Sequence, residues 1–222
     1  MLICRLYGMS DGKSDTLASR KTLVRTYMME YVGAIIGILV SILFAILWVT
    51  AVLVNGDWHL GEDTLSELGG NVPSRWIFNI AVILTAIGGL RFSFTFATFL
   101  SPSRSGRVGS YLLATSSIGL MAIGFFPIDT GQPHTIATAF FFGFAAIASF
   151  VLLYPIGKKA GFRSLQFLLT MAVIIVSFAS LATTPIAFAE AVAVSGLLAW
   201  IFVIGIWIAR DVRKRVDALP VK

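Results

Sequence analysis

Six long runs of apolar residues constrain the fold of this chain more than any other feature. Each run is long enough to cross a bilayer as a helix, because a transmembrane helix needs about 20 predominantly apolar residues. The composition agrees, since 57% of the 222 residues are hydrophobic and only 13% are charged, about half the charged share of a soluble domain. We therefore predict an all-α, polytopic membrane protein with six transmembrane helices in an antiparallel up-and-down bundle.

The predicted membrane domain covers residues 31–210 and lies between two basic tails, residues 1–30 and 211–222. The spans are expected at about residues 31–54, 74–100, 108–126, 133–156, 164–183 and 186–208. The loops between them are too short to hold a soluble domain. The first apolar run begins too late and is too long for the core of a signal peptide, so we expect it to be the first span.

Basic residues are distributed unevenly between the two sides of the predicted bilayer. Fifteen of the 17 lysines and arginines lie on one side, in the terminal segments and in loops 101–107 and 157–163, and the other two, Arg75 and Arg91, lie within the second span. The loops on the opposite side are acidic and contain neither residue type. Because lysine and arginine favour the cytoplasmic side, we predict a multi-pass protein of the cell membrane with both termini in the cytoplasm.

The charge pattern also limits the partners. The net charge of +6 does not indicate nucleic acid, because the basic residues flank apolar runs and form no cluster with interleaved aromatics. Membrane lipids are the expected partners. Gly33 and Gly37 form a Gly-x-x-x-Gly pair that permits close helix approach, so homo-oligomers through small-residue helix faces are a further hypothesis. Cys4 is the single cysteine, which excludes a disulfide within the chain.

Two motifs lie in the predicted outer loops. The first is Leu65-Ser66-Glu67-Leu68-Gly69, followed by Pro73 and Phe78-Asn79, and the second is Gly124-Phe125-Phe126-Pro127 with Asp129, Gly131 and His134. In this order and on one membrane face, they resemble the prokaryotic family called domain of unknown function 998, which more commonly has Asp at position 67. The resemblance covers about residues 31–210, implies a six-helix fold and supplies no activity. More distantly, the chain is similar to the Frag/DRAM/Sfk membrane proteins.

Polar residues near the predicted outer mouth are candidates for a binding site, since ionisable groups close to the membrane interior are often functional. The candidates are Glu67, Arg75, Asn79, Asp129, His134 and Glu190. Such a site would hold a lipid headgroup, a cation or a small polar solute. Arg75 suits a phosphate because its guanidinium offers a bidentate fork, and Asn79 lies one turn deeper. Binding without catalysis is the interpretation we favour.

A membrane-embedded hydrolase that acts on a lipid is the alternative. Catalytic zinc could be held by the two histidines, His59 and His134, and by one acid. Asp129 and Glu67 are the candidates for that acid, and water would fill the fourth position. Without a metal, Ser66 could be the nucleophile, with His134 as its base and Asp129 as the group that orients the base. The sequence contains no His-Glu-x-x-His motif, so zinc is a hypothesis and no cofactor is predicted firmly.

A structural or assembly protein is the third interpretation. In that case Ser66 caps a short helix or the start of the second span, and Glu67 pairs with Arg75. Asp129 and His134 then satisfy backbone groups at a turn and at a helix end. All three interpretations place the polar residues at the same end of the bundle, so the sequence leaves the choice among them open.

Overall fold

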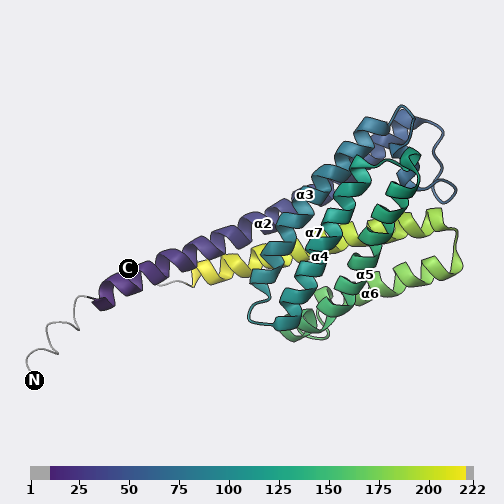
Figure 1. Ribbon diagram of the computed structural model, residues 1–222. Coiled ribbons are helices and arrows are strands. Elements are labelled where there is room, and N and C mark those ends of the chain that lie inside the picture. The colour runs from purple at the N-terminus through teal and green to yellow at the C-terminus, as the bar shows by residue number, and fades with distance from the viewer. Residues whose placement is uncertain (1–10, 219–222) are drawn as a thin grey trace, which may run out of the picture.

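A computed structural model describes residues 11–218 of the chain, with side chains for residues 22–218 (Figure 1). The elements are α2 (Asp11–Asn55), η1 (Leu65–Gly69), α3 (Arg75–Phe99), α4 (Arg104–Phe125), η2 (Ile128–Thr130), α5 (Gln132–Ala160), α6 (Leu165–Thr183) and α7 (Ile186–Asp217). Within the described residues, six helices are long and apolar enough to cross a membrane. The predicted fold class is therefore confirmed.

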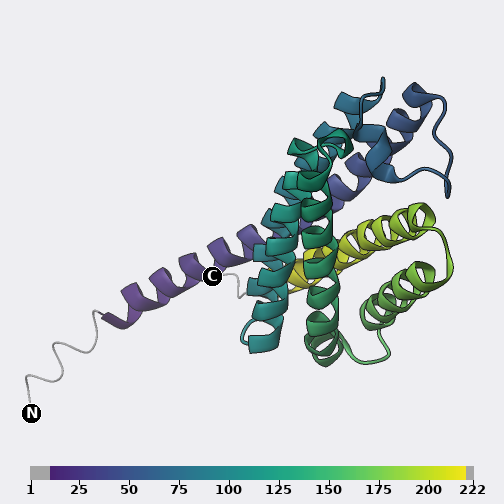
Figure 2. The ribbon, with the colours of Figure 1, turned by 45° about the vertical axis from the view of Figure 1, so that its right-hand side comes forward.

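The six long helices form a ring in chain order. Each helix packs against the next one along the chain, and α7 packs back against α2. Successive helices are antiparallel (Figures 1 and 2). We call the end that carries loop one (residues 56–64), η1 and η2 the acidic end. The opposite end, where α2 begins and α7 ends, is the basic end.

The helix boundaries follow local signals at the acidic end. Pro133 lies in the first turn of α5, where a missing N–H costs nothing, and Pro185 separates α6 from α7. At the basic end two helices extend beyond the predicted spans. Helix α2 begins at Asp11, and α7 continues to Asp217. The described parts of the two predicted tails are thus helical, and the rest of each tail lies outside the described residues.

Two clusters of buried apolar side chains fill the ring. The cluster near the basic end contains Phe92, Phe96 and Trp200, and the Phe96 and Trp200 ring centroids lie 5.7 Å apart at a steep angle. The indole N–H of Trp200 donates to Thr170 Oγ1 at 2.8 Å. The cluster near the acidic end is built from α2, η1, α3, α4 and α5. Aromatic side chains therefore fill the interior of the ring near the basic end.

Gly33 and Gly37 bring α2 close to α3 within the chain. A Cβ at Gly37 would lie 2.4 Å from the Phe92 ring, and a Cβ at Gly33 would overlap Thr95. The close approach that the Gly-x-x-x-Gly pair predicted is thus used between two helices of one molecule. Assembly into homo-oligomers stays a prediction.

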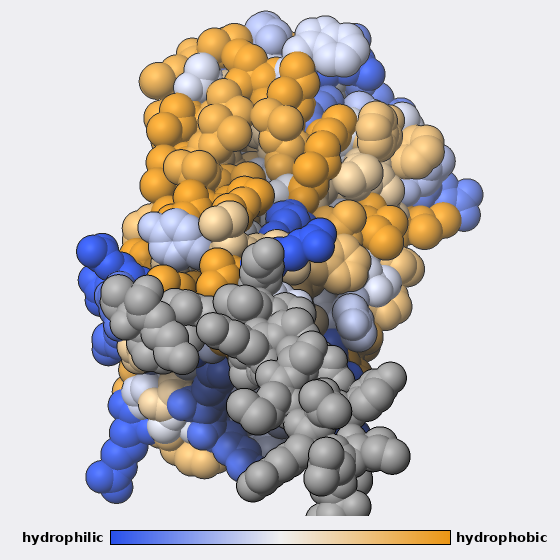
Figure 3. All heavy atoms as spheres, turned by 90° about the vertical axis from the view of Figure 1, so that its left-hand side faces the viewer, coloured by the Kyte–Doolittle hydropathy of each residue, from blue (hydrophilic) through white to orange (hydrophobic). Residues whose placement is uncertain are grey.

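Large apolar side chains cover much of the outer surface (Figure 3). Leu53, Trp76 and Ile186 are more than half exposed. Soluble monomers rarely expose so many large apolar side chains together. This surface is the one expected of helices that face lipid.

Candidate functional site

The first motif of the sequence forms η1, which lies across the acidic end of the ring. Leu65 and Leu68 are buried beneath it. Two side chains from the neighbouring segment secure its last carbonyls, since Ser74 Oγ donates to Leu68 O at 2.8 Å and Asn79 Nδ2 donates to Gly69 O at 2.9 Å. Asn79 therefore anchors the motif.

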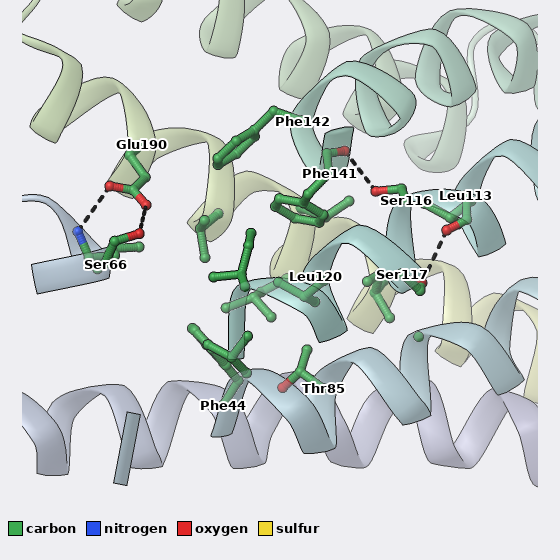
Figure 4. Close-up of a pocket in the computed structure, with 18 of the residues that line it drawn as sticks. Phe44, Ser66, Thr85, Leu113, Ser116, Ser117, Leu120, Phe141, Phe142 and Glu190 are labelled. Carbon is green, nitrogen blue, oxygen red and sulfur yellow. Dashed lines mark hydrogen bonds between the residues drawn. The ribbon is translucent and has the colours of Figure 1, made fainter. Parts of the chain in front are cut away.

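Glu190, near the start of α7, holds the other end of η1 (Figure 4). Its Oε2 accepts the backbone N–H of Leu65 at 3.0 Å, and its Oε1 accepts the hydroxyl of Ser66 at 3.2 Å. A carboxylate is favourable beside the free N–H groups of a helix start. The contact joins two segments that are more than 120 residues apart in sequence.

The ion pair at the acidic end differs from the predicted one. Arg75 Nη1 lies 3.4 Å from Asp129 Oδ2, and Asp129 Oδ1 accepts the N–H of Asn71 at 3.1 Å. Glu67 instead accepts the backbone N–H of Thr64 at 3.1 Å, as a residue three positions into a helix commonly does. The predicted pairing of Glu67 with Arg75 is therefore wrong.

His134 is buried in the first turn of α5, and its ring is held in a defined orientation. Nδ1 lies 2.8 Å from the carbonyl oxygen of Phe126. A carbonyl can only accept, so Nδ1 carries the proton and Nε2 of the neutral ring is an acceptor. Nε2 lies 3.3 Å from Thr138 Oγ1. The group that orients His134 is thus a backbone carbonyl and not the carboxylate of Asp129.

A lateral groove of about 440 Å³ lies between α5, α6 and α7. At the acidic end, the start of α5 lies apart from the end of α6 and the start of α7 in Figure 2. Its polar lining consists mainly of Thr64, Ser66, His134, Thr138 and Glu190 at the acidic end. Apolar side chains such as Phe178 and Leu181 line the remainder. The structure therefore brings together three of the predicted site residues, Ser66, His134 and Glu190.

A smaller cavity of about 60 Å³ lies inside the ring (Figure 4). Ser66, Phe142 and Glu190 border both this cavity and the groove. The hydroxyl of Thr85 is buried in its wall and has no hydrogen-bond partner among the described residues. Since one water needs roughly 10–15 Å³ of such space, the cavity has room for a few water molecules next to that hydroxyl.

Four other predicted site residues do not line the groove. They are Glu67, Arg75, Asn79 and Asp129, and they bond instead to loop segments at its rim. His59 is on loop one, with 69% of its side chain exposed and its Nδ1 3.8 Å from Asp63. Within the part of the chain that the structure describes, no three His, Cys, Asp or Glu side chains form a group that could hold a metal ion. The predicted zinc ligands His59, His134 and Asp129 are not brought together.

Sequence reasoning missed Thr138 and Phe142, which line the groove. The signal for Thr138 was its spacing, four residues after His134, which places both side chains on one helix face. Nothing local singles out Phe142 among the neighbouring phenylalanines. It borders the groove only because α5 packs with that face toward α7.

A ring of six apolar helices with polar groups gathered at its ends defines a multi-pass integral membrane protein. The chain belongs to the family described as "Protein of unknown function (DUF998)", which matches residues 38–207. This confirms the resemblance carried by the two sequence motifs. No curated protein and no solved structure was found to match the chain, and the distant similarity to the Frag/DRAM/Sfk proteins stays a prediction.

Proposed function

We propose that this protein binds a membrane lipid in the groove between α5, α6 and α7, without catalysis, and that the polar group of the lipid is a hydrogen-bond donor. The observation that carries the proposal is the polarity of the groove. His134, Ser66 and Glu190 gather at one end together with the hydroxyls of Thr64 and Thr138, and most of the remaining lining is apolar. A lipid likewise has a polar headgroup at one end and apolar acyl chains along the rest of its length. A volume of about 440 Å³ falls in the range of ligand pockets.

The charges around the groove favour a donor headgroup over a phosphate. Glu190 offers carboxylate oxygens, and the hydroxyl of Thr138, which donates to Nε2 of His134, offers its oxygen lone pairs. No lysine or arginine is among the residues that line this groove in the described structure. Arg75, which the sequence suggested for phosphate binding, pairs with Asp129 at the rim. An ammonium headgroup with N–H donors, such as that of phosphatidylethanolamine, matches these acceptors.

The positive-inside pattern supports a location on the extracytoplasmic side of the cell membrane. Loop one, η1 and η2 contain no lysine or arginine, whereas the opposite end carries most of them. Under this orientation the groove opens to the outer leaflet. The lipid would enter sideways from the bilayer, between α5 and α6.

The test compares phosphatidylethanolamine with phosphatidylcholine, whose quaternary ammonium has no N–H. Native mass spectrometry of the purified protein in detergent should show preferential binding of phosphatidylethanolamine. Glu190→Gln should reduce that preference about tenfold, because a hydrogen bond to a charged acceptor contributes about 1.5–3 kcal/mol. Glutamine keeps one oxygen to accept the Leu65 N–H, so η1 should stay in place.

A tryptophan that fills the groove separates binding in the groove from binding elsewhere. Ala139 lines the groove, and Ala45 lies on the exposed face of α2, outside it. Ala139→Trp should abolish the preference for phosphatidylethanolamine, and Ala45→Trp should leave it unchanged. Equal binding by the two variants would contradict the proposal and favour a structural role for the polar end.

A lipid hydrolase is the second candidate, because Ser66 and His134 border the same groove. The hydroxyl of Ser66 donates to Glu190, so it would have to turn toward His134 Nε2 before that nitrogen could act as its base. An activated phosphonate that labels the wild type but not Ser66→Ala would support hydrolysis. Absence of labelling, with lipid binding intact, would support binding without catalysis.

A further inference from the structure

We propose a second lipid site at the opposite, basic end of the molecule, where the phosphate of an anionic phospholipid binds between the start of α6 and the end of α7. A pocket of about 400 Å³ lies there. It is lined by Leu165 and Gln166 of α6 and by Val203, Ile206, Trp207, Arg210, Asp211 and Lys214 of α7. This site shares no residue with the groove, so each proposal can fail without the other.

Two uncompensated cations face this pocket. Arg210 and Lys214 are four residues apart on α7, so their side chains lie on one face of the helix. Among the described residues, neither side chain takes part in a hydrogen bond or an ion pair. A guanidinium binds phosphate oxygens through two parallel N–H groups, and an ammonium adds a point charge.

The acid in the pocket does not neutralise these cations. Asp211 Oδ2 lies 2.9 Å from Arg215 Nε. Arg215 also pairs with Glu30 through Nη2, at 2.9 Å. The negative charge of Asp211 is thus directed toward Arg215. The pocket therefore keeps a net positive charge from Arg210 and Lys214.

The remaining walls favour a lipid over a free phosphate ion. From Val203 to Lys214 the helix rises ~16 Å along its axis, with Val203, Ile206 and Trp207 below the two cations. An anionic phospholipid has the same arrangement, with acyl chains below a phosphate, and tryptophan is typical of the interface between them. A soluble ion would contact only the cationic half.

Native mass spectrometry of the full chain in detergent tests the site, with phosphatidylglycerol as the anionic probe and phosphatidylcholine as the neutral one. Each basic side chain near anionic lipid strengthens association about fivefold. Arg210→Gln/Lys214→Gln should therefore weaken phosphatidylglycerol binding about 25-fold. The matched control is Lys158→Gln/Arg213→Gln, which removes the same charge from exposed residues outside the pocket and should change binding less than about twofold. An equal loss in both double variants would overturn the proposal.

Val203→Trp keeps both cations and fills the apolar half of the pocket, so it should also lose phosphatidylglycerol binding. If Val203→Trp bound phosphatidylglycerol as the wild type does, the lipid would be held by diffuse attraction to the basic end, and the proposed pocket would be contradicted.

Sodium phosphate at millimolar concentration should not displace phosphatidylglycerol. Displacement would identify free phosphate as the ligand and contradict the proposal that the ligand is a lipid. Unchanged heat-unfolding midpoints establish that the variants are folded. If the double variant unfolds early, Arg210→Gln alone should weaken binding about fivefold.

Discussion

At the scale of single residues, Glu30 shows how this chain accommodates a buried charge. Only 4% of its side chain is exposed, and Arg215 Nη2 lies 2.9 Å from its carboxylate. The guanidinium of Arg215 also lies over the ring of Tyr27, at 4.8 Å from the centroid. Glu30 belongs to the predicted N-terminal tail and Arg215 to the C-terminal one, so the pair ties the start of the bundle to its end.

Removal of Arg215 should destabilise the protein more than removal of the charge of Glu30. Arg215→Met leaves Glu30 buried without its cation, and we expect a loss of about 2–3 kcal/mol, below the usual cost for a fully buried pair because the guanidinium is partly exposed. Glu30→Gln leaves Arg215 paired with Asp211 and should cost about 1 kcal/mol.

Heat unfolding in detergent measures both variants, together with their double mutant. The double mutant should lose less than the sum of the single losses, because the two side chains interact. Arg213→Met, an exposed neighbour, should change stability by no more than about 0.5 kcal/mol. Strict additivity would mean that the pair does not form.

At the scale of elements, η1 is a short helix held from three directions. Glu190 binds its first residues, Ser74 and Asn79 bind its last carbonyls, and its leucines enter the core. A 3₁₀ helix of this length has little intrinsic stability. Its position therefore depends on these contacts, which also set the place of Ser66 beside the groove.

Gly69, the last residue of η1, lies against the start of α3. A Cβ there would lie 2.4 Å from Asn79 Oδ1 and 3.1 Å from the Phe78 ring. Gly69→Ala should therefore displace the Asn79 amide and cost about 1–3 kcal/mol in heat unfolding. The matched control is Gly143→Ala, where a Cβ meets nothing within 4 Å. Alanine in that helix should be neutral or stabilising by up to about 1 kcal/mol. Similar stability of the two variants would show that η1 can shift freely.

At the scale of the whole molecule, the distribution of charge predicts how the bundle is oriented in the membrane. The acidic end carries Asp63, Glu67, Asp129 and Glu190, and the basic end carries Lys159, Arg210, Lys214 and Arg215. The basic end should remain in the cytoplasm. The groove and the basic pocket would then face opposite leaflets of the membrane.

Single cysteines test this orientation in a Cys4→Ser background. Leu60→Cys and Gln132→Cys are at exposed positions of the acidic end, and Ser105→Cys and Ala160→Cys are at the basic end. An impermeant thiol reagent applied to intact cells should label the first two and spare the other two until the cells are opened. The reverse pattern would place the groove on the cytoplasmic side.

The sequence by itself determined the number of spans, their order and most of their ends at the acidic side. These properties depend on local features, namely the length of an apolar run and the position of a proline such as Pro133 or Pro185. The same reasoning correctly singled out the two motifs that lead to the family. It placed Ser66, His134 and Glu190 at one end of the bundle, because hydropathy alone assigns each loop to a side.

Only the tertiary structure decided which of these polar side chains meet. Glu190 reaches Ser66 across the ring, Arg75 pairs with Asp129 and not with Glu67, and His134 is oriented by the carbonyl of Phe126. Such pairings depend on how loops fold over helix ends and on which face each helix turns inward. Neither property is encoded in the spacing of residues along one segment, because both follow from packing between segments that are distant in the chain.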